Sequence, residues 1–221
     1  MNFFMQYDVI IIGAGPGGIF SAYELSKLCP EKKIAVFEEG QPLEKRKCPI
    51  DGKTVKHCVG CPTCAIMNGF GGAGAFSDGK YNLTNDFGGT LYEYIGKKQA
   101  MELMHYVDAI NVSHGGENTK LYSTANSAFK TRCLQCGLHL LDASVRHLGT
   151  DINFVVLKNL FAELEPKVDF HFRTPVRKVL AKDGGYEIVT DSGSHTCSQC
   201  IISVGRSGSK WMESVCKDLA I

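Results

Sequence analysis

The sequence predicts an α/β protein with a strand–helix–strand unit at its start. Three observations support this prediction. The short apolar run Val9 to Ile12 is typical of a buried strand. Glycines follow it at once and lead into a helical pattern that ends near Leu28, with Pro30 beyond it. A second apolar run, at residues 34–37, ends in two acidic residues.

The glycine-rich turn between the first strand and the helix predicts a dinucleotide site. Gly13, Gly15 and Gly18 fit the spacing G-x-G-x-x-G. We expect them to make a tight turn, to let the backbone approach a pyrophosphate, and to let helix and strand pack closely. The helix N-terminus offers N–H groups to phosphates. Glu38 lies 20 residues after Gly18, where a carboxylate can accept from a ribose hydroxyl. A glycine turn that only reverses the chain would need these features to coincide by accident.

Composition narrows the class of protein. A chain of 221 residues with 44% hydrophobic residues can bury the core of one or two globular domains. Its net charge of +1 gives no field to attract nucleic acid or an anionic membrane, so we expect neither as a partner. No Lys or Arg precedes Lys27 and the apolar runs are short, which argues against a signal peptide or membrane span. We expect a cytoplasmic protein that acts on a small molecule.

The rest of the chain alternates loops, helices and strands. Residues 40–90 are rich in Gly, Cys and Pro, and such a long loop is usually functional. Residues 91–165 are predicted to be mainly helical, with helices at 91–106 and 153–164. Strands are expected at residues 168–173, 176–181, 186–190 and 200–204, with turns at 183–185 and 191–194.

Three features favour FAD over NAD. The glycine fingerprint lies near the N-terminus, and residues 69–79 form a second glycine-rich loop whose N–H groups can line a pyrophosphate or a flavin edge. The alternative is that this loop is a set of tight turns with a structural role and no ligand contact. The late strand 201–205 is similar to the strand that returns to the sheet in two-domain flavoproteins. Glu38 would repel a 2′-phosphate, which disfavours NADP.

Five motifs together resemble the FAD-dependent dehydrogenases, a prokaryotic group of NAD(P)/FAD-dependent oxidoreductases. They are VIIIGAGPGG, RKCP, GFGGAGAFSDGK, RHLGTD and VGRSG, at residues 9–18, 46–49, 69–80, 146–151 and 204–208. The resemblance implies a Rossmann-type FAD-binding domain, residues 1–90 and 166–221, with an inserted α+β substrate domain at 91–165. Members of this group are longer, so the resemblance also implies a C-terminally truncated chain.

The resemblance also implies a set of cofactor contacts. Glycines of the fingerprint would hold the pyrophosphate, carboxylates after the second strand the ribose, Arg46 the region of the phosphates, and Val176 the adenine. Residues of the second glycine loop would line the flavin or its ribityl chain, and Gly205 the returning strand. The full set is Gly13, Gly15, Gly17, Gly18, Glu38, Glu39, Arg46, Gly71, Gly72, Ser77, Gly79, Val176 and Gly205.

The predicted function is that of an FAD-dependent oxidoreductase that transfers a hydride through the flavin, with NAD(P)H as a possible electron donor. The alternative is a non-catalytic FAD- or nucleotide-binding fragment, or a subunit that a partner chain completes. An NAD-dependent dehydrogenase would require a separate catalytic domain with a proton donor. The sequence does not identify one.

The ten cysteines raise the question of a metal site. Cys58, Cys61 and Cys64 form C-x-x-C-x-x-C, with Cys48 ten residues upstream. Four thiolates could hold Zn or an Fe–S cluster. A redox dithiol of Cys61 and Cys64 and a set of free thiols are the alternatives.

His147 is the candidate for a proton-transferring group on the substrate side, because histidine titrates near neutral pH. A histidine that caps a helix or bonds a backbone carbonyl is the alternative. The adjacent Arg146 could bind a substrate carboxylate or form an ion pair.

Overall fold

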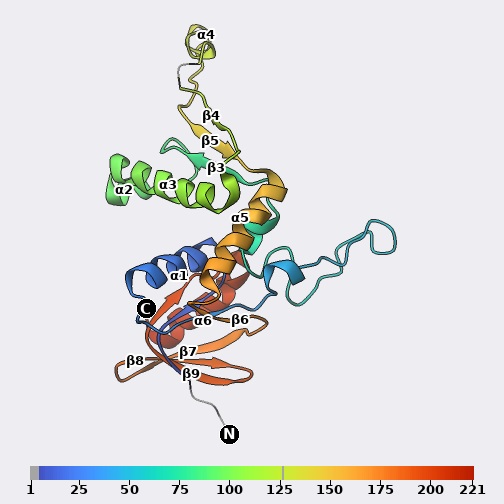
Figure 1. Ribbon diagram of the computed structural model, residues 1–221, viewed down its shortest axis with the longest axis vertical. Coiled ribbons are helices and arrows are strands. Elements are labelled where there is room, and N and C mark those ends of the chain that lie inside the picture. The colour runs from blue at the N-terminus through green and yellow to red at the C-terminus, as the bar shows by residue number, and fades with distance from the viewer. Residues whose placement is uncertain (1–4, 126) are drawn as a thin grey trace. The chain divides into compact units, whose positions relative to one another are not determined.

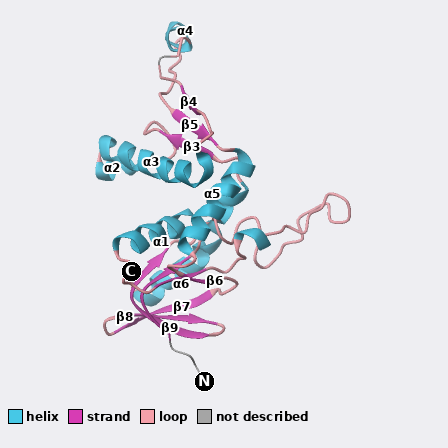
Figure 2. Ribbon diagram, viewed as in Figure 1, coloured by secondary structure: helices cyan, strands magenta, loops and turns pink. Residues whose placement is uncertain are grey.

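The computed structural model describes residues 5–125 and 127–221. They form two compact units, Met1–Ala75 with Leu160–Ile221, and Phe76–Asn159. The sequence placed the boundaries at residues 90 and 165, so strand β3 (Lys80–Leu83) falls in the second unit rather than the first. Figures 1 and 2 show the elements of each unit.

The first unit is built on a six-stranded sheet in which four neighbouring strands are parallel. An antiparallel pair completes one edge. In spatial order the strands are β6 (Asp169–His171), β2 (Ile34–Phe37), β1 (Met5–Ile12), β9 (Gly193–Ile202), β8 (Gly185–Thr190) and β7 (Val176–Lys182). The predicted α/β class with a parallel core is confirmed.

Strand β1 lies at the centre of the sheet and is buried on both faces. Its residue Ile10 pairs with Ala35 of β2 on one side and with Cys200 of β9 on the other. Helix α1 (Pro16–Leu28) contacts β1 and β2, while α6 (Ser209–Leu219) packs Val215 and Trp211 against the core that contains Ile10. Two covered faces explain why the strand is apolar at consecutive positions instead of alternating.

Helix α1 begins one residue earlier than predicted, at Pro16, because proline has no N–H to lose in the first turn of a helix. Strand β9 is longer than the predicted 200–204. Cys197 and Cys200 both lie within it. The short helices η1 (Leu43–Lys45) and η4 (Arg206–Gly208) complete the first unit.

The second unit combines an antiparallel sheet with helices. The sheet order is β3-β5-β4, with β5 at Ser144–His147 and β4 at Leu121–Ser123. Helices cover most of residues 91–165, as predicted, and the sheet gives this region the α+β character that the resemblance implies. Its individual strands were not predicted, because they are short and carry no apolar alternation. The remaining elements are α2 (Leu91–Ile95), α3 (Lys97–Asn111), the π-helical turn η3 (Val112–Gly116) and α4 (Phe129–Gln135).

Gly96 explains a second difference from the prediction. Its φ of 82° ends α2 and starts α3, so the single helix expected at 91–106 is broken there. Two further elements, η2 (Gly72–Phe76) and α5 (Gly149–Leu164), contribute residues to both units. Among the described residues, no helix has the length and apolarity needed to cross a bilayer.

Candidate functional site

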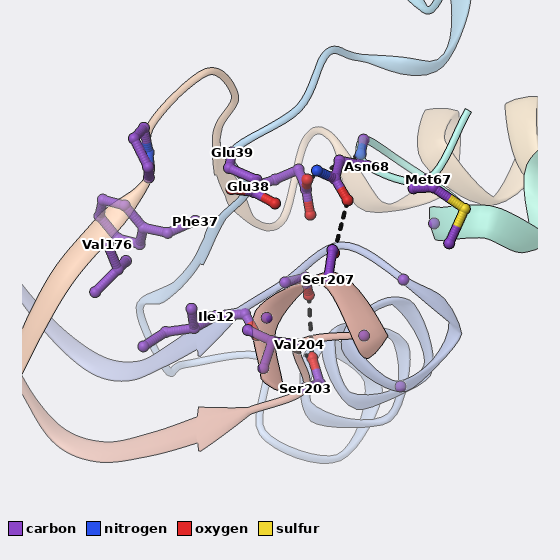
Figure 3. Close-up of a pocket in the computed structure, with 18 of the residues that line it drawn as sticks. Ile12, Phe37, Glu38, Glu39, Met67, Asn68, Val176, Ser203, Val204 and Ser207 are labelled. Carbon is purple, nitrogen blue, oxygen red and sulfur yellow. Dashed lines mark hydrogen bonds between the residues drawn. The ribbon is translucent and has the colours of Figure 1, made fainter. Parts of the chain in front are cut away.

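A cavity of about 490 Å³ opens where the parallel strands of the first unit end. Ile12, Phe37 and Ser203, which end or follow β1, β2 and β9, line it. Figure 3 shows Glu38, Glu39, Asn68 and Met67 on one side, with Ile12, Ser203 and Val204 across from them. The chain leaves β1 toward β2 on one side, while β9 lies on the other, so the cavity is at the topological switch point of the sheet.

The fingerprint turn has the geometry that its glycines predict. Gly13 has a φ of +103°, and a Cβ there would lie 2.8 Å from the carbonyl oxygen of Ser203. A Cβ at Gly18 would overlap the carbonyl oxygen of Gly13. Glycine is therefore required at both positions, for the turn and for the close packing of α1 on the strand ends.

The N-terminus of α1 lies at the cavity. Gly15 is the N-cap and offers no side-chain cap, and Pro16 and Gly17 also line the cavity. The first hydrogen bond of the helix runs from the N–H of Ile19 to the carbonyl oxygen of Gly15. The N–H groups of Gly17 and Gly18 therefore have no acceptor within the helix. A Cβ on Gly15 would meet only Gly72 Cα at 4.0 Å. This terminus is suited to an anion.

The second glycine loop lies against the first. Gly71 donates its N–H to the carbonyl of Ala14 (2.8 Å), and a Cβ at Gly72 would lie 3.1 Å from the Cα of Gly15. Phe70 is fully buried, with its ring 5.0 Å from that of Phe161. Gly72, like Gly69, Ala73 and Gly74, lines the cavity. The two glycine-rich segments therefore form one continuous backbone wall.

Glu38 is engaged by the backbone. Its Oε2 accepts from the N–H of Ala14 at 2.7 Å, and its Oε1 accepts from the N–H groups of Gly40 and Gly69, both at 2.8 Å. Glu38 is 7% exposed but still lines the cavity. The sequence predicted a ribose contact at this residue. The structure adds three backbone contacts that spacing alone did not indicate.

Arg46 is also held by the backbone, and it does not line the cavity. Its guanidinium donates to the carbonyls of Ala65, Ile66, Phe70 and Gly72 at 2.7–2.9 Å. Burial lowers its pKa to about 10, although Glu38 opposes that shift. Arg46 therefore supports the backbone of the second glycine loop, and its place near the phosphates stays a prediction.

Glu39 presents an exposed carboxylate to the same cavity. Partial burial and the charge of Glu38 raise its pKa, while Arg177 opposes that shift. Arg177 also lines the cavity and is paired with Asp191 at 2.6 Å. This end of the cavity thus carries carboxylates, whereas the end at α1 carries N–H groups.

The returning strand supplies polar groups that sequence reasoning missed. Ser203 donates through Oγ to the carbonyls of Ile12 and Gly13, both at 3.1 Å. Ser207 donates to Asn68 at 2.9 Å, which joins the turn after β9 to the second glycine loop (Figure 3). Both serines lie in or beside the VGRSG motif, and Asn68 directly precedes the glycine loop, so proximity to motifs was the available signal.

Val176 and Gly205, two predicted contacts, also line the cavity. Phe37 stands beside Val176 and was not predicted. Its ring stacks on His171 at 4.4 Å, and Tyr7 bonds that histidine at 3.0 Å. Burial lowers the pKa of His171, an effect that Asp169 opposes.

The predicted residues of the second unit lie outside this cavity lining. The N–H of Gly79 donates to Ser77 Oγ at 3.2 Å, and its carbonyl accepts from Leu148. His147 ends β5 with an exposed side chain. Arg146 is not free for a substrate carboxylate, because it makes a bidentate pair with Asp108. Roles of Ser77, Gly79 and His147 toward a cofactor or substrate stay predictions.

The four cysteines proposed as metal ligands are not brought together. In the part of the chain that the structure describes, no group of three or more His, Cys, Asp or Glu residues is placed to hold a metal. Cys58 and Cys61 are exposed on the loop 47–64, which extends away from the sheet (Figure 1). Cys48 and Cys64 are partly buried. The loop has no helix or strand to fix a tetrahedral arrangement.

Comparison with known proteins shows the fold. No protein-family model matches the sequence, and no curated protein sequence is detectably similar to it. Glycine oxidase from Geobacillus kaustophilus superposes with a TM-score of 0.56 at 15% identity, over 98% of this chain and 59% of the oxidase. A mutant FrdA of E. coli quinol fumarate reductase gives 0.53 at 14%, over 94% and 34%. The chain therefore spans less than two thirds of either structure, and it shares with them an α/β fold with a parallel-sheet core.

Proposed function

We propose that this chain forms the FAD-binding part of a flavoprotein oxidoreductase. The observation that carries the proposal is the cavity at the switch point of the parallel sheet, into which an uncapped helix N-terminus and two glycine-rich backbone segments open. The fold shared with an oxidase and a reductase supports it, as does the resemblance to the FAD-dependent dehydrogenases.

The residues of the cavity fit the parts of FAD in order. The N–H group of Gly17 suits the pyrophosphate, and the missing side chains of Gly15 and Gly72 leave the space that it needs. The carboxylate end suits the ribose, and Val176 suits the adenine. FAD, when bound, supplies the hydride chemistry, while the protein binds and orients it.

The activity is proposed for the whole protein, because the chain spans 59% of the oxidase and 34% of the reductase that it resembles in fold. The described residues do not identify the small-molecule substrate or the electron donor, NAD(P)H included. They give no support to Zn or an Fe–S cluster as part of the function.

This proposal is tested by measuring FAD binding to the wild type and to a variant whose side chain fills the cavity. The purified chain, refolded with FAD, should quench flavin fluorescence and gain a flavin absorption spectrum. Gly15→Val should abolish both. Gly15 has a φ of −74°, and a Cβ there meets no atom closer than 4.0 Å, so the valine side chain fills ligand space with little effect on the fold.

Circular dichroism should therefore show the same folded state for wild type and Gly15→Val. A wild-type chain that binds no FAD under these conditions would contradict the proposal. Equal FAD affinity in the two proteins would also contradict it, because the ligand would then lie elsewhere.

A further inference from the structure

A side-chain hydrogen bond joins two walls of the cavity. Ser207 donates through Oγ to Oδ1 of Asn68 at 2.9 Å, across 139 positions of the sequence. Both residues line the cavity, and Figure 3 shows the bond between the segment that carries Met67 and the turn that carries Val204. Among the described residues, the structure records no other hydrogen bond between residues 67–69 and 203–208.

The turn after β9 is fixed without this bond. The N–H and the Oγ of Ser203 donate to the carbonyl of Ile12 at 2.9 and 3.1 Å, which fastens the start of the turn to the end of β1. A Cβ on Gly208 would lie 2.7 Å from the Cβ of Val204, so the turn packs closely on itself. Ser207 is exposed between these two anchor points.

The opposite wall is also fixed by its own contacts. The N–H of Asn68 donates to the carbonyl of Cys64 at 2.9 Å, and the N–H of Gly69 donates to Oε1 of Glu38 at 2.8 Å. The backbone of Asn68 is therefore held in place, and its side chain carries the contact to the other wall. Neither wall depends on that contact for its shape.

The bond is of a kind that opens readily. It joins two neutral groups, and it lies where water can replace either partner. A neutral hydrogen bond that competes with water favours the bonded arrangement only about two- to tenfold. The two side chains therefore separate often, and no other part of the fold has to unfold when they do.

We propose that the bond between Asn68 and Ser207 is a clasp over the cavity, which opens to admit FAD, closes behind it and opens again for release. The inference rests on the proposed FAD site. Because the clasp joins protein to protein in the free and in the loaded state, it slows entry and release by the same factor and leaves the affinity unchanged. A direct ligand contact would instead slow release alone.

Stopped-flow measurement of flavin fluorescence tests the clasp. Ser207→Ala should raise the association and the dissociation rate of FAD together, each about two- to tenfold, and leave Kd within about twofold. Ser207→Thr keeps the hydroxyl and should have wild-type rates. The matched control is Ser209→Ala, because Ser209 is exposed two residues further on, at the start of α6, and is not part of the cavity lining.

Two results would overturn the proposal. Unchanged rates in Ser207→Ala would show that the bond does not control access to the cavity. A rise in the dissociation rate with an equal loss of affinity would make Ser207 a contact of the ligand.

Asn68→Ala shows whether the two side chains act as one device. It should change both rates as Ser207→Ala does, and the double variant should be no faster than either single variant, because each substitution breaks the same bond. Fold-changes that multiply in the double variant would show that the two residues act independently, which contradicts a clasp.

Hydrogen exchange without ligand keeps this inference distinct from the proposed function. Ser207→Ala should speed amide exchange of residues 67–69, on the opposite wall, about two- to tenfold, whereas Ser207→Thr and Ser209→Ala should not. Unchanged exchange would overturn the clasp whether or not FAD binds. If the wild type binds no FAD, the proposed function fails and the control of access fails with it, while the exchange rates still report whether the bond joins the walls.

Discussion

Arg146 and Asp108 form a bidentate ion pair in the second unit, with Nε–Oδ1 at 2.6 Å and Nη2–Oδ2 at 2.8 Å. Their side chains are 12% and 10% exposed. The same arginine donates to the carbonyl of Thr119 at 2.8 Å, so it joins β5, α3 and the segment before β4. A guanidinium engaged in this way is a structural element of the unit.

Removing this arginine should destabilise the protein strongly. Arg146→Met leaves a nearly buried carboxylate without its partner, and we expect a loss of about 3 kcal/mol in the free energy of unfolding. The matched control is Arg177→Met, whose pair with Asp191 is 58% and 63% exposed and should contribute less than about 1 kcal/mol. Urea denaturation measures both. Similar losses in the two variants would show that the Arg146 pair is no stronger than a surface pair.

Substitution of Arg46 should lower the free energy of unfolding about as much as substitution of Arg146. Arg46→Met would leave four carbonyls without their donor, and we expect a loss of about 3 kcal/mol or more. Lys47→Met removes a neighbouring exposed cation and should change stability by less than about 0.5 kcal/mol. A stable Arg46→Met protein with weakened FAD binding would instead favour the phosphate role that the sequence suggested.

Features that depend on residues close together in the chain could be predicted from the sequence, and features that join distant segments could not. The fingerprint from Gly13 to Gly18 could be interpreted because the φ of Gly13, the contact of Gly18 with Gly13 and the start of the helix depend on neighbouring residues. The contacts of Glu38 with Gly69 and of Arg46 with Phe70 could not, since each joins residues 24–31 positions apart. The sheet β3-β5-β4 was missed because its strands are short and lack apolar alternation, and because β3 and β5 pair across some sixty residues of intervening chain.

Two glycine substitutions should show that the cost in stability comes from close packing at the glycine and not from its position near the cavity. Gly18→Ala places a Cβ against the carbonyl of Gly13, and we expect a loss of about 1–3 kcal/mol from overpacking between α1 and β1. Gly205 also lines the cavity, but a Cβ there meets nothing within 4 Å, so Gly205→Ala should stay within about 0.5 kcal/mol of wild type. Thermal and urea unfolding check both variants. Equal stabilities would mean that the α1–β1 contact relaxes without cost.

The cysteine loop should behave as free thiols. Cys58 and Cys61 are exposed, so they should react rapidly with a thiol reagent in the native protein, whereas the buried Cys197 should react only on unfolding. Replacing Cys58, Cys61 and Cys64 by serine should leave FAD binding unchanged. Stoichiometric Zn or Fe in the wild type that is lost from this triple variant would establish the metal site instead.

The stability of the first unit should fall in mild acid because of His171. Burial lowers the pKa of this histidine below its ordinary value of 6.5, although Asp169 of β6 opposes that shift. His195 of β9 also has a pKa lowered by burial and by His171, and Tyr7 of β1 and Phe37 of β2 complete the cluster.

The unfolded chain gains protons as the pH falls through about 6.5, while the folded protein gains them only at lower pH. The stabilising effect of a neutral His171 is therefore present above that pH and is lost as the pH falls toward its folded pKa. His171→Phe keeps a ring against Phe37 and should flatten the decline in unfolding free energy between about pH 6.5 and 5, whereas substitution of the exposed His139 by Gln should not. If the pH profile of His171→Phe is parallel to that of the wild type, His171 is not the group that destabilises the folded protein in acid.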